Sequence, residues 1–224
     1  MKNVKGEVHK TLLSNEIDVL KTLSDLQNVI KLHEVIPLKS HTCIVTELCD
    51  GGDLAKLIKE HRHLSEARAT ELLTQIINGY KGINRFGIVH RDLKPANIFF
   101  SAKDVKIADF GFAVRSQDLK KHSNYNVGSP VYMPLEALND NIYSPKSDVW
   151  AIGVIFYEML TGNTPWRAKT EADLKRQIKA ISIKSILPVG VSKTASAFLV
   201  KALQINPTQR MSPEEMITFF DEGR

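Results

Sequence analysis

The segment Lys146–Leu160 constrains the fold of this chain most strongly, because apolar residues cover nearly all of its faces. A helix that is apolar on every side has to be surrounded by other parts of the protein. Gly162 and Pro165 follow closely and are typical of a helix end. The apolar run is too short to cross a bilayer. We therefore predict a helix at the centre of a globular fold, and no membrane span.

The composition is that of an ordinary globular protein. The 224 residues suffice for one large domain or two small lobes, with 43% hydrophobic and 25% charged residues. The net charge of +5 comes from Lys and Arg spread along the sequence, so we predict no nucleic-acid partner. The two cysteines, Cys43 and Cys49, lack metal-site spacing, and no signal peptide opens the chain. We therefore expect a cytoplasmic location.

A glycine pair, Gly51-Gly52, divides the predicted elements into two groups. Before it, apolar residues at helical spacing predict a helix over Leu12–Leu26, and branched residues predict strands over 29–38 and 42–48. After it, we predict short strands at 88–89, 98–100 and 105–108, and helices at 54–61, 65–85 and along the tail from Glu171. The polar stretch Arg115–Asn126 predicts a mobile surface loop. The pattern favours an α+β fold with two lobes and a hinge near the glycines.

The stretch His90–Asn97, with the sequence HRDLKPAN, carries the clearest chemistry. Asp92 can accept a proton, Lys94 can hold a phosphate oxygen, and Asn97 offers a carbonyl oxygen suited to Mg²⁺. Such a set suits the transfer of a phosphoryl group to a hydroxyl group. The alternative is a polar turn between two strands, which would rarely contain the whole run by chance.

A second acid follows in the segment Asp109–Gly111, whose sequence is DFG. It lies twelve residues after Asn97. The Asp109 carboxylate would face Mg²⁺ and neutralise charge on the transferring phosphates. Three residues alone recur by chance, and a strand-ending Asp in a turn is the alternative. The order and distance behind HRDLKPAN favour the functional interpretation, so we predict Asn97 and Asp109 as metal ligands.

These motifs resemble those of a eukaryotic serine/threonine protein kinase domain, and further segments follow in the same order. Gly128–Met133 is similar to the substrate-docking segment of that family, Ser147–Gly153 to its buried central helix, and Asn206–Arg210 to its late arginine segment. The resemblance covers nearly the whole chain. It implies a two-lobe fold in which residues 1–48 form a partial N-terminal lobe and residues 49–224 form a mainly helical C-terminal lobe.

The resemblance implies which residues bind ATP. Thr46 would be the gatekeeper beside the adenine, and the backbones of Glu47 and Cys49 would offer hydrogen bonds to the adenine edge. Asp53 would face the ribose, and Phe99 would form the floor beneath the adenine. The cofactors implied are ATP and Mg²⁺.

Other implied roles concern the reaction and its scaffold. Glu16 would pair with a phosphate-binding lysine, Asp92 would orient and deprotonate the substrate hydroxyl, and Asp148 would brace the catalytic loop. Glu136 would pair with Arg210 inside the C-terminal lobe. A spine linking the lobes would consist of Leu20, Leu32, His90 and Phe110, which makes His90 structural.

Some residues indicate the class of kinase and its regulation. Lys94 and Ser129 are residues that resemble those of serine/threonine kinases, and not those of tyrosine kinases, at the corresponding positions. The implied partner is therefore a protein substrate. Arg91 is typical of kinases switched by activation-loop phosphorylation, since it can pair with a phosphate. Ser123 and Tyr125 are candidate acceptors for an upstream activating kinase, and ordinary loop polarity is the alternative.

Two features depart from the family pattern. Pro134–Glu136 stands where family members read Ala-Pro-Glu, which shifts the proline by one position. Before Glu16 we find no Gly-rich loop and no strand with the phosphate-binding lysine, because Lys2, Lys5 and Lys10 lack the Val-Ala-x-Lys context. We therefore expect an N-terminally truncated domain with an exposed sheet edge and poor activity by itself.

Three functions are compatible with these observations. The leading one is a serine/threonine protein kinase, and Glu47–Leu54 also resembles the autophagy-initiating kinases. The second is a truncated, non-catalytic kinase fold that binds or regulates partners. The missing lysine favours it, and the intact Asp92, Asn97 and Asp109 oppose it. The third is a small-molecule kinase, which would not need Gly128–Met133.

Overall fold

The computed structural model describes residues 7–39, 41–122 and 127–220. Its helices are α1 (Glu7–Leu23), α2 (Leu54–His61), α3 (Glu66–Arg85), α4 (Leu135–Asp140), α5 (Pro145–Thr161), α6 (Glu171–Ala180), α7 (Lys193–Ala202) and α8 (Pro213–Thr218). Its strands are β1 (Leu32–Pro37), β2 (Thr42–Thr46), β3 (Ile88–Val89), β4 (Ile98–Ser101), β5 (Asp104–Ile107) and β6 (Val114–Arg115). Its 3₁₀ helices are η1 (Pro95–Asn97), η2 (Ser116–His122), η3 (Pro130–Tyr132) and η4 (Ile183–Ser185).

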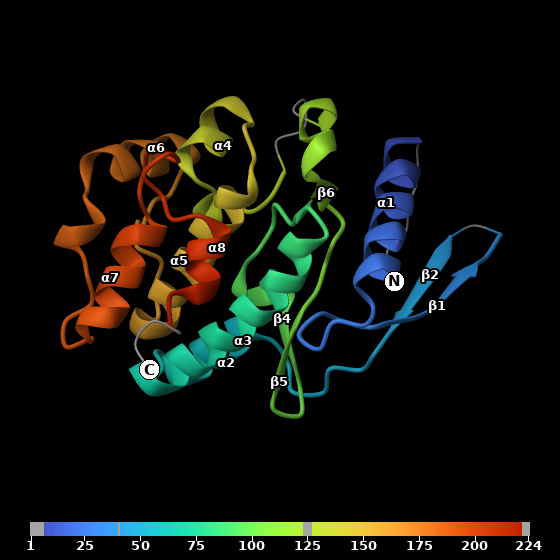
Figure 1. Ribbon diagram of the computed structural model, residues 1–224, viewed down its shortest axis with the longest axis horizontal. Helices are drawn as coiled ribbons and strands as arrows, with labels where there is room; N and C mark the ends of the chain where they lie inside the picture. Colours follow the sequence, from blue (N-terminus) through green and yellow to red (C-terminus); the bar gives the residue numbers. More distant parts are fainter. Residues whose placement is uncertain (1–6, 40, 123–126, 221–224) are drawn as a thin grey trace.

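The described part of the chain has a small strand-containing portion and a larger, mostly helical portion, which confirms the predicted α+β class. The strands pair as three antiparallel two-stranded sheets, β1–β2, β3–β6 and β4–β5. Figure 1 shows α1 and the β1–β2 hairpin on one side, α4 to α8 on the other, and α3 with the β4–β5 hairpin between them. Of the helices described, none is both long enough and apolar enough to span a membrane.

Helix α5 lies at the centre of the helical portion, as its sequence predicts. Most of its side chains are buried, and it packs against α3, α7 and α8. Trp150 stacks face to face on Trp166, with ring centroids 5.2 Å apart. The Ser144 hydroxyl caps the first turn, and Gly162 ends the helix in a left-handed conformation. The apolar faces of α5 therefore form the core of this portion.

Helices α2 and α3 begin where their polar caps predict. The Asp53 carboxylate accepts a hydrogen bond from the N–H of Lys56, and the Ser65 hydroxyl accepts one from the N–H of Arg68. Glu66 lies in the first turn of α3, where a negative charge favours the helix dipole. These local signals explain why the predicted starts of both helices are confirmed.

The prediction of one strand over residues 29–38 is correct only for β1. Val29 instead forms an isolated bridge with Ile107 of β5, and the Ile30 N–H donates to the Ile107 carbonyl over 2.9 Å. The backbone of residues 29–30 therefore pairs with a residue far away in the sequence. This pairing connects the β1–β2 sheet to β5. The predicted hairpin of residues 98–100 and 105–108 is confirmed as β4 and β5.

The predicted surface loop over Arg115–Asn126 contains regular secondary structure along most of its length, which the sequence did not predict. Arg115 belongs to β6, which pairs with β3, and Ser116–His122 form η2. A short 3₁₀ helix needs no apolar stripe, so a polar sequence does not reveal it. Residues 123–126 lie outside the described ranges, as do the candidate phosphate acceptors Ser123 and Tyr125.

The end of α5 allows a stability prediction. Gly162 has φ +73°, and a Cβ atom there would lie 1.7 Å from the Arg62 carbonyl oxygen. We expect Gly162→Ala to lower the free energy of unfolding by about 2 kcal/mol, because it adds a steric overlap to an unfavourable φ. Gly190→Ala is the matched control, since Gly190 has φ +83° with open space around it. Equal losses for both variants in urea denaturation would contradict the steric contribution.

Candidate active site

The catalytic loop is held in place by a carboxylate of α5. The Asp148 carboxylate accepts hydrogen bonds from the backbone N–H of His90, over 2.8 Å, and from the backbone N–H of Arg91, over 3.0 Å. Asp148 is buried, and burial raises its pKa to about 7, although these donors and the Arg91 charge act in the opposite direction. Arg91 has φ +67°, an uncommon conformation for a residue with a side chain. The bracing role implied for Asp148 agrees with this geometry.

Asp92 lies at the centre of a cluster of polar side chains. Its carboxylate accepts hydrogen bonds from the Lys94 ammonium, over 2.8 Å, and from the Ser129 hydroxyl, over 3.0 Å. The Lys94 ammonium also donates to the Ser129 hydroxyl over 3.0 Å. The Asn97 amide donates to the backbone carbonyl of Asp92 over 2.9 Å and to its carboxylate over 3.2 Å. The predicted catalytic residues Asp92, Lys94 and Asn97 are thus brought together.

Asp109 is placed next to this cluster by a backbone hydrogen bond. The N–H of Ala108 donates to the Asn97 carbonyl over 2.9 Å, so the residue before Asp109 is fixed against Asn97. Asp109 itself has φ +63°. Because the Asn97 amide N–H group is directed at Asp92, its amide oxygen is left for another partner. An amide oxygen and a carboxylate therefore lie on adjoining segments, and Asp109 also lines a cavity.

That cavity has a volume of about 480 Å³ and lies between the small sheet, α1 and the β4–β5 hairpin. Four predicted ATP-site residues line it: Glu16, Thr46, Phe99 and Asp109. The other lining residues, none of which was predicted as part of the ATP site, are Leu13, Leu20, Ile30, Thr42, Cys43, Ile44 and Ala108. The volume and mixed lining are typical of a small-molecule site.

Three predicted ATP-site residues do not line this cavity. The Glu47 carboxylate pairs with the Lys106 ammonium at 3.1 Å and accepts the Lys31 N–H over 2.7 Å. The Glu47 N–H donates to the Lys31 carbonyl over 2.9 Å, so this N–H is already used within the protein. Cys49 is partly buried, and burial raises the pKa of its thiol. The Asp53 carboxylate caps α2, as described above.

His90 is buried and packs against another residue of the implied spine. Its ring centroid lies 4.9 Å from that of Phe110, and its Nε2 lies 3.1 Å from the Ala108 carbonyl oxygen. Burial lowers its pKa, although the Ala108 carbonyl and the nearby carboxylates act in the opposite direction. A buried ring of this kind, packed against Phe110, is consistent with a structural role.

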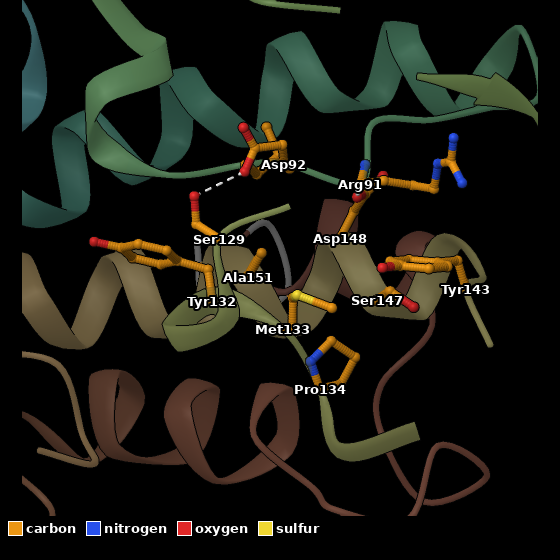
Figure 2. Close-up of a pocket in the computed structure, with 11 residues that line it drawn as sticks. Arg91, Asp92, Ser129, Tyr132, Met133, Pro134, Tyr143, Ser147, Asp148 and Ala151 are labelled. Atoms are coloured by element: carbon orange, nitrogen blue, oxygen red, sulfur yellow. Dashed lines mark hydrogen bonds between the residues drawn. The ribbon is translucent and has the colours of Figure 1, made fainter. Parts of the chain in front are cut away.

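The segment Gly128–Met133, which the resemblance implies to dock the substrate, lies against the implied catalytic loop, His90–Asn97. A small pocket of about 10 Å³ is lined by Ser129, Tyr132, Met133 and Pro134 on one side and by Asp92 and Asp148 on the other. Figure 2 shows the Ser129 side chain directed at Asp92. A Cβ atom on Gly128 would lie 2.5 Å from the Arg91 carbonyl oxygen, so the two backbones are in close contact. Ser129 is therefore held within reach of Asp92 by the path of the backbone.

Two contacts of this segment were not predicted from the sequence. The Tyr132 hydroxyl donates to the Glu158 carboxylate of α5 over 2.8 Å, and burial raises the pKa of both groups. The Tyr143 ring lies under the guanidinium of Arg91, 5.3 Å from its central carbon. Tyr143 is an aromatic residue in a polar stretch just before α5, a position that does not by itself indicate this contact.

The predicted pair of Glu136 and Arg210 is present. The Arg210 guanidinium donates to both carboxylate oxygens of Glu136, over 2.7 and 3.1 Å. Arg210 is buried, stacks over the Trp150 ring at 5.0 Å, and also donates to backbone carbonyls of the α7–α8 connection. The shift of the proline in Pro134–Glu136 has not displaced this pair.

Comparison with known proteins decides the family. A family model described as "Protein kinase domain" matches residues 1–219. The chain belongs to the protein kinase family. Among the relatives of this kinase domain, serine/threonine-protein kinase atg1 of Dictyostelium discoideum is 36% identical over 210 residues, covering 91% of this chain and 31% of that protein. This relative is a serine/threonine-protein kinase, in agreement with the predicted class.

Two further relatives carry the same description. Serine/threonine-protein kinase unc-51 of Caenorhabditis elegans is 35% identical over 220 residues, covering 92% of the chain and 26% of that protein. Serine/threonine-protein kinase ULK1 of Homo sapiens is 36% identical over 217 residues, covering 92% of the chain and 20% of that protein. The chain thus spans less than one third of the length of these curated relatives.

Protein kinases in general use ATP with Mg²⁺ and act on proteins, and the site fits this requirement. Among the described residues, no group of three or more His, Cys, Asp and Glu side chains could hold a metal ion. Mg²⁺ in kinases is held by one or two protein oxygens together with phosphates and water, so no such group is needed. The Asn97 amide oxygen and the Asp109 carboxylate supply the chemistry that Mg²⁺ prefers.

Proposed function

We propose that this kinase domain transfers the γ-phosphate of ATP to serine and threonine hydroxyls of a protein substrate. The observation that carries the proposal is the cluster of Asp92, Lys94 and Asn97 beside a cavity of about 480 Å³ that Asp109 lines. No packing requirement explains why these polar groups converge there. Phosphoryl transfer requires such a set of positioned groups.

Asp92 is the residue that would receive the proton of the substrate hydroxyl. Its carboxylate is almost wholly buried, with 3% side-chain exposure, and Lys94 and Ser129 hold its oxygens. The Lys94 ammonium, 2.8 Å from that carboxylate, would also stabilise the negative charge of the phosphoryl group. Ser129 lies in the segment that would hold the substrate backbone, so binding of a substrate and orientation of Asp92 are coupled.

The phosphates would be held at the edge where the cavity meets the cluster. Asn97 and Asp109 would bind Mg²⁺, which neutralises charge on the phosphates when it is bound. Glu16, on α1, lines the same cavity and is 7% exposed. The Asn15 amide of α1 donates to the Ala113 carbonyl, which keeps α1 against the segment after Asp109. This contact supports a phosphate-facing role for Glu16.

The rest of the cavity would hold the nucleoside. Thr46 and Phe99 line it and would contact the adenine. The Glu47 carbonyl and the Cys49 backbone would bond the adenine edge. Asp53 would reach the ribose with the oxygen that does not cap α2, since the cap uses only Oδ1.

We also propose the division into a partial N-terminal lobe over residues 1–48 and a C-terminal lobe over residues 49–224. The antiparallel bridge of Asp53 with Phe99 supports the boundary, because it attaches the chain to the helical portion just after the glycine pair. The two thiols are unpaired, which supports a reducing compartment, and we propose the cytoplasm.

Regulation by an upstream kinase remains a prediction. Arg91 is 5% exposed, and its Nε donates to the Phe112 carbonyl over 2.7 Å. Its buried Nη1 has no hydrogen-bond partner among the described residues, so one donor is available for a phosphate. Ser123 and Tyr125, the candidate acceptors, lie outside the described residues.

The proposal is tested by incubating the 224-residue chain with radiolabelled ATP and a mixture of serine, threonine and tyrosine peptides. We expect transfer to serine and threonine peptides that stops when EDTA removes Mg²⁺, because Asn97 and Asp109 would act through that ion. Transfer to tyrosine alone would contradict the substrate class. Absence of transfer from this chain and from a longer form of the protein would favour the non-catalytic alternative.

A further inference from the structure

Tyr143 lies at a junction of three segments of the active site. It belongs to the connection between α4 and α5 and is buried, with 7% of its surface exposed. Its hydroxyl donates to the Val127 carbonyl over 2.6 Å and accepts the Val127 N–H over 3.3 Å. Both backbone groups of Val127, the residue that precedes the docking segment Gly128–Met133, are therefore bound by a single side chain.

The ring of Tyr143 contacts the catalytic loop at the same time. The Arg91 guanidinium lies over this ring, 5.3 Å from its centroid, and Figure 2 shows both side chains at the same end of the pocket. Such a contact is favourable because the face of an aromatic ring attracts a cation, and more so when both groups are desolvated. The Arg91 Nε in turn donates to the Phe112 carbonyl, just after the DFG segment.

The position of Tyr143 also depends on α5. Ser144, the next residue, caps α5, and Asp148 in its first turn holds the catalytic loop. The beginning of one buried helix therefore fixes the catalytic loop through Asp148 and the docking segment through Tyr143. Val127 is only two residues from Ser129, which donates to the Asp92 carboxylate over 3.0 Å.

We infer that Tyr143 is a positioning residue that anchors the docking segment to the catalytic loop and so places Ser129 on Asp92. This inference rests on the proposed function for its kinetic consequence, but the anchoring itself does not. Tyr143 is not among the residues that line the cavity that would hold ATP, and its hydroxyl bonds to Val127. Its loss should therefore affect the use of a protein substrate and leave the binding of ATP unchanged.

Tyr143→Phe tests the inference, because it keeps the ring over Arg91 and removes both hydrogen bonds to Val127. The matched control is Tyr157→Phe, since the Tyr157 hydroxyl donates to the Ile186 carbonyl over 2.8 Å, outside the described active site. We expect hydrogen exchange of residues 127–133 to become about tenfold faster in Tyr143→Phe only. Unchanged exchange there, or an equal change in the control, would overturn the inference.

The kinetic arm uses the same two variants. We expect kcat/KM for a serine peptide to fall about tenfold in Tyr143→Phe, with the KM for ATP unchanged, and both to stay constant in Tyr157→Phe. An equal rise in the KM for ATP and the KM for the peptide would mean general damage to the fold and would overturn the positioning role. Faster exchange in Tyr143→Phe, together with no phosphoryl transfer by the wild-type chain or by a longer form of the protein, would support the anchoring and contradict the proposed function.

Discussion

Replacing Asp92 with asparagine is expected to lower kcat for phosphoryl transfer about 1,000-fold, because the group that would take the substrate proton is lost. Asparagine keeps the size of the side chain. Its oxygen can accept from Lys94, which binds Oδ2, and its amide N–H can donate to the Ser129 hydroxyl, which lies at Oδ1. The fold and the affinity for ATP should therefore remain close to those of the wild type. Single-turnover assays with saturating ATP would measure the loss directly.

The control for this variant is Asp104→Asn. Asp104 is an exposed residue at the start of β5, away from the cluster around Asp92, and its replacement should leave kcat unchanged. A kcat for Asp92→Asn within a factor of ten of the wild-type value would exclude Asp92 as the proton acceptor. A similar loss in Asp104→Asn would mean that the effect comes from the fold.

Replacing Glu136 with alanine is expected to lower the free energy of unfolding by about 4 kcal/mol, since the buried Arg210 charge would lose its partner. Arg210 has no exposed side-chain surface, and Glu136 holds it with two hydrogen bonds of 2.7 and 3.1 Å. The remaining acceptors around Arg210 are neutral backbone carbonyls. Urea denaturation, monitored by tryptophan fluorescence, would measure the change.

Two further variants distinguish the cost of leaving the Arg210 charge buried and unpaired from the cost of losing an ordinary ion pair. Glu171→Ala removes a more exposed pair with Lys175, at 2.7 Å, and should cost at most about 1 kcal/mol. Adding Arg210→Met to Glu136→Ala removes the unpaired charge and should recover part of the loss. A loss for Glu136→Ala no larger than that for Glu171→Ala would contradict a buried, energetically coupled pair.

The elements that the sequence predicts best are those with local signals. The caps Asp53 and Ser65 gave correct starts for α2 and α3, and the apolar faces of 146–160 gave the central position of α5. The strand pattern of residues 29–30 was misleading, because these residues pair with Ile107 and not with β2. A pattern of alternating residues does not reveal which distant strand will pair with it.

In the active site, too, contacts within one short motif could be predicted from the sequence, whereas contacts between distant segments could not. Asp92, Lys94 and Asn97 come from one short motif, so their proximity follows from the sequence, and the positions of Glu16, Thr46, Phe99 and Asp109 at one cavity agree with the implied roles. The contacts of Tyr143 with Arg91 and of Tyr132 with Glu158 join residues far apart in the chain. Aromatic residues at such positions are most often packing residues, so no sequence pattern distinguished them.

The most direct test of the proposed site is Mg²⁺-dependent ATP binding by the 224-residue chain, measured by isothermal titration calorimetry. We predict that the wild type and Asp104→Asn bind ATP in the presence of Mg²⁺, and that Asp109→Asn loses this binding because one metal-facing carboxylate is removed. ATP binding that is the same in Asp109→Asn, or the same without Mg²⁺, would contradict a metal–nucleotide site built from Asn97 and Asp109.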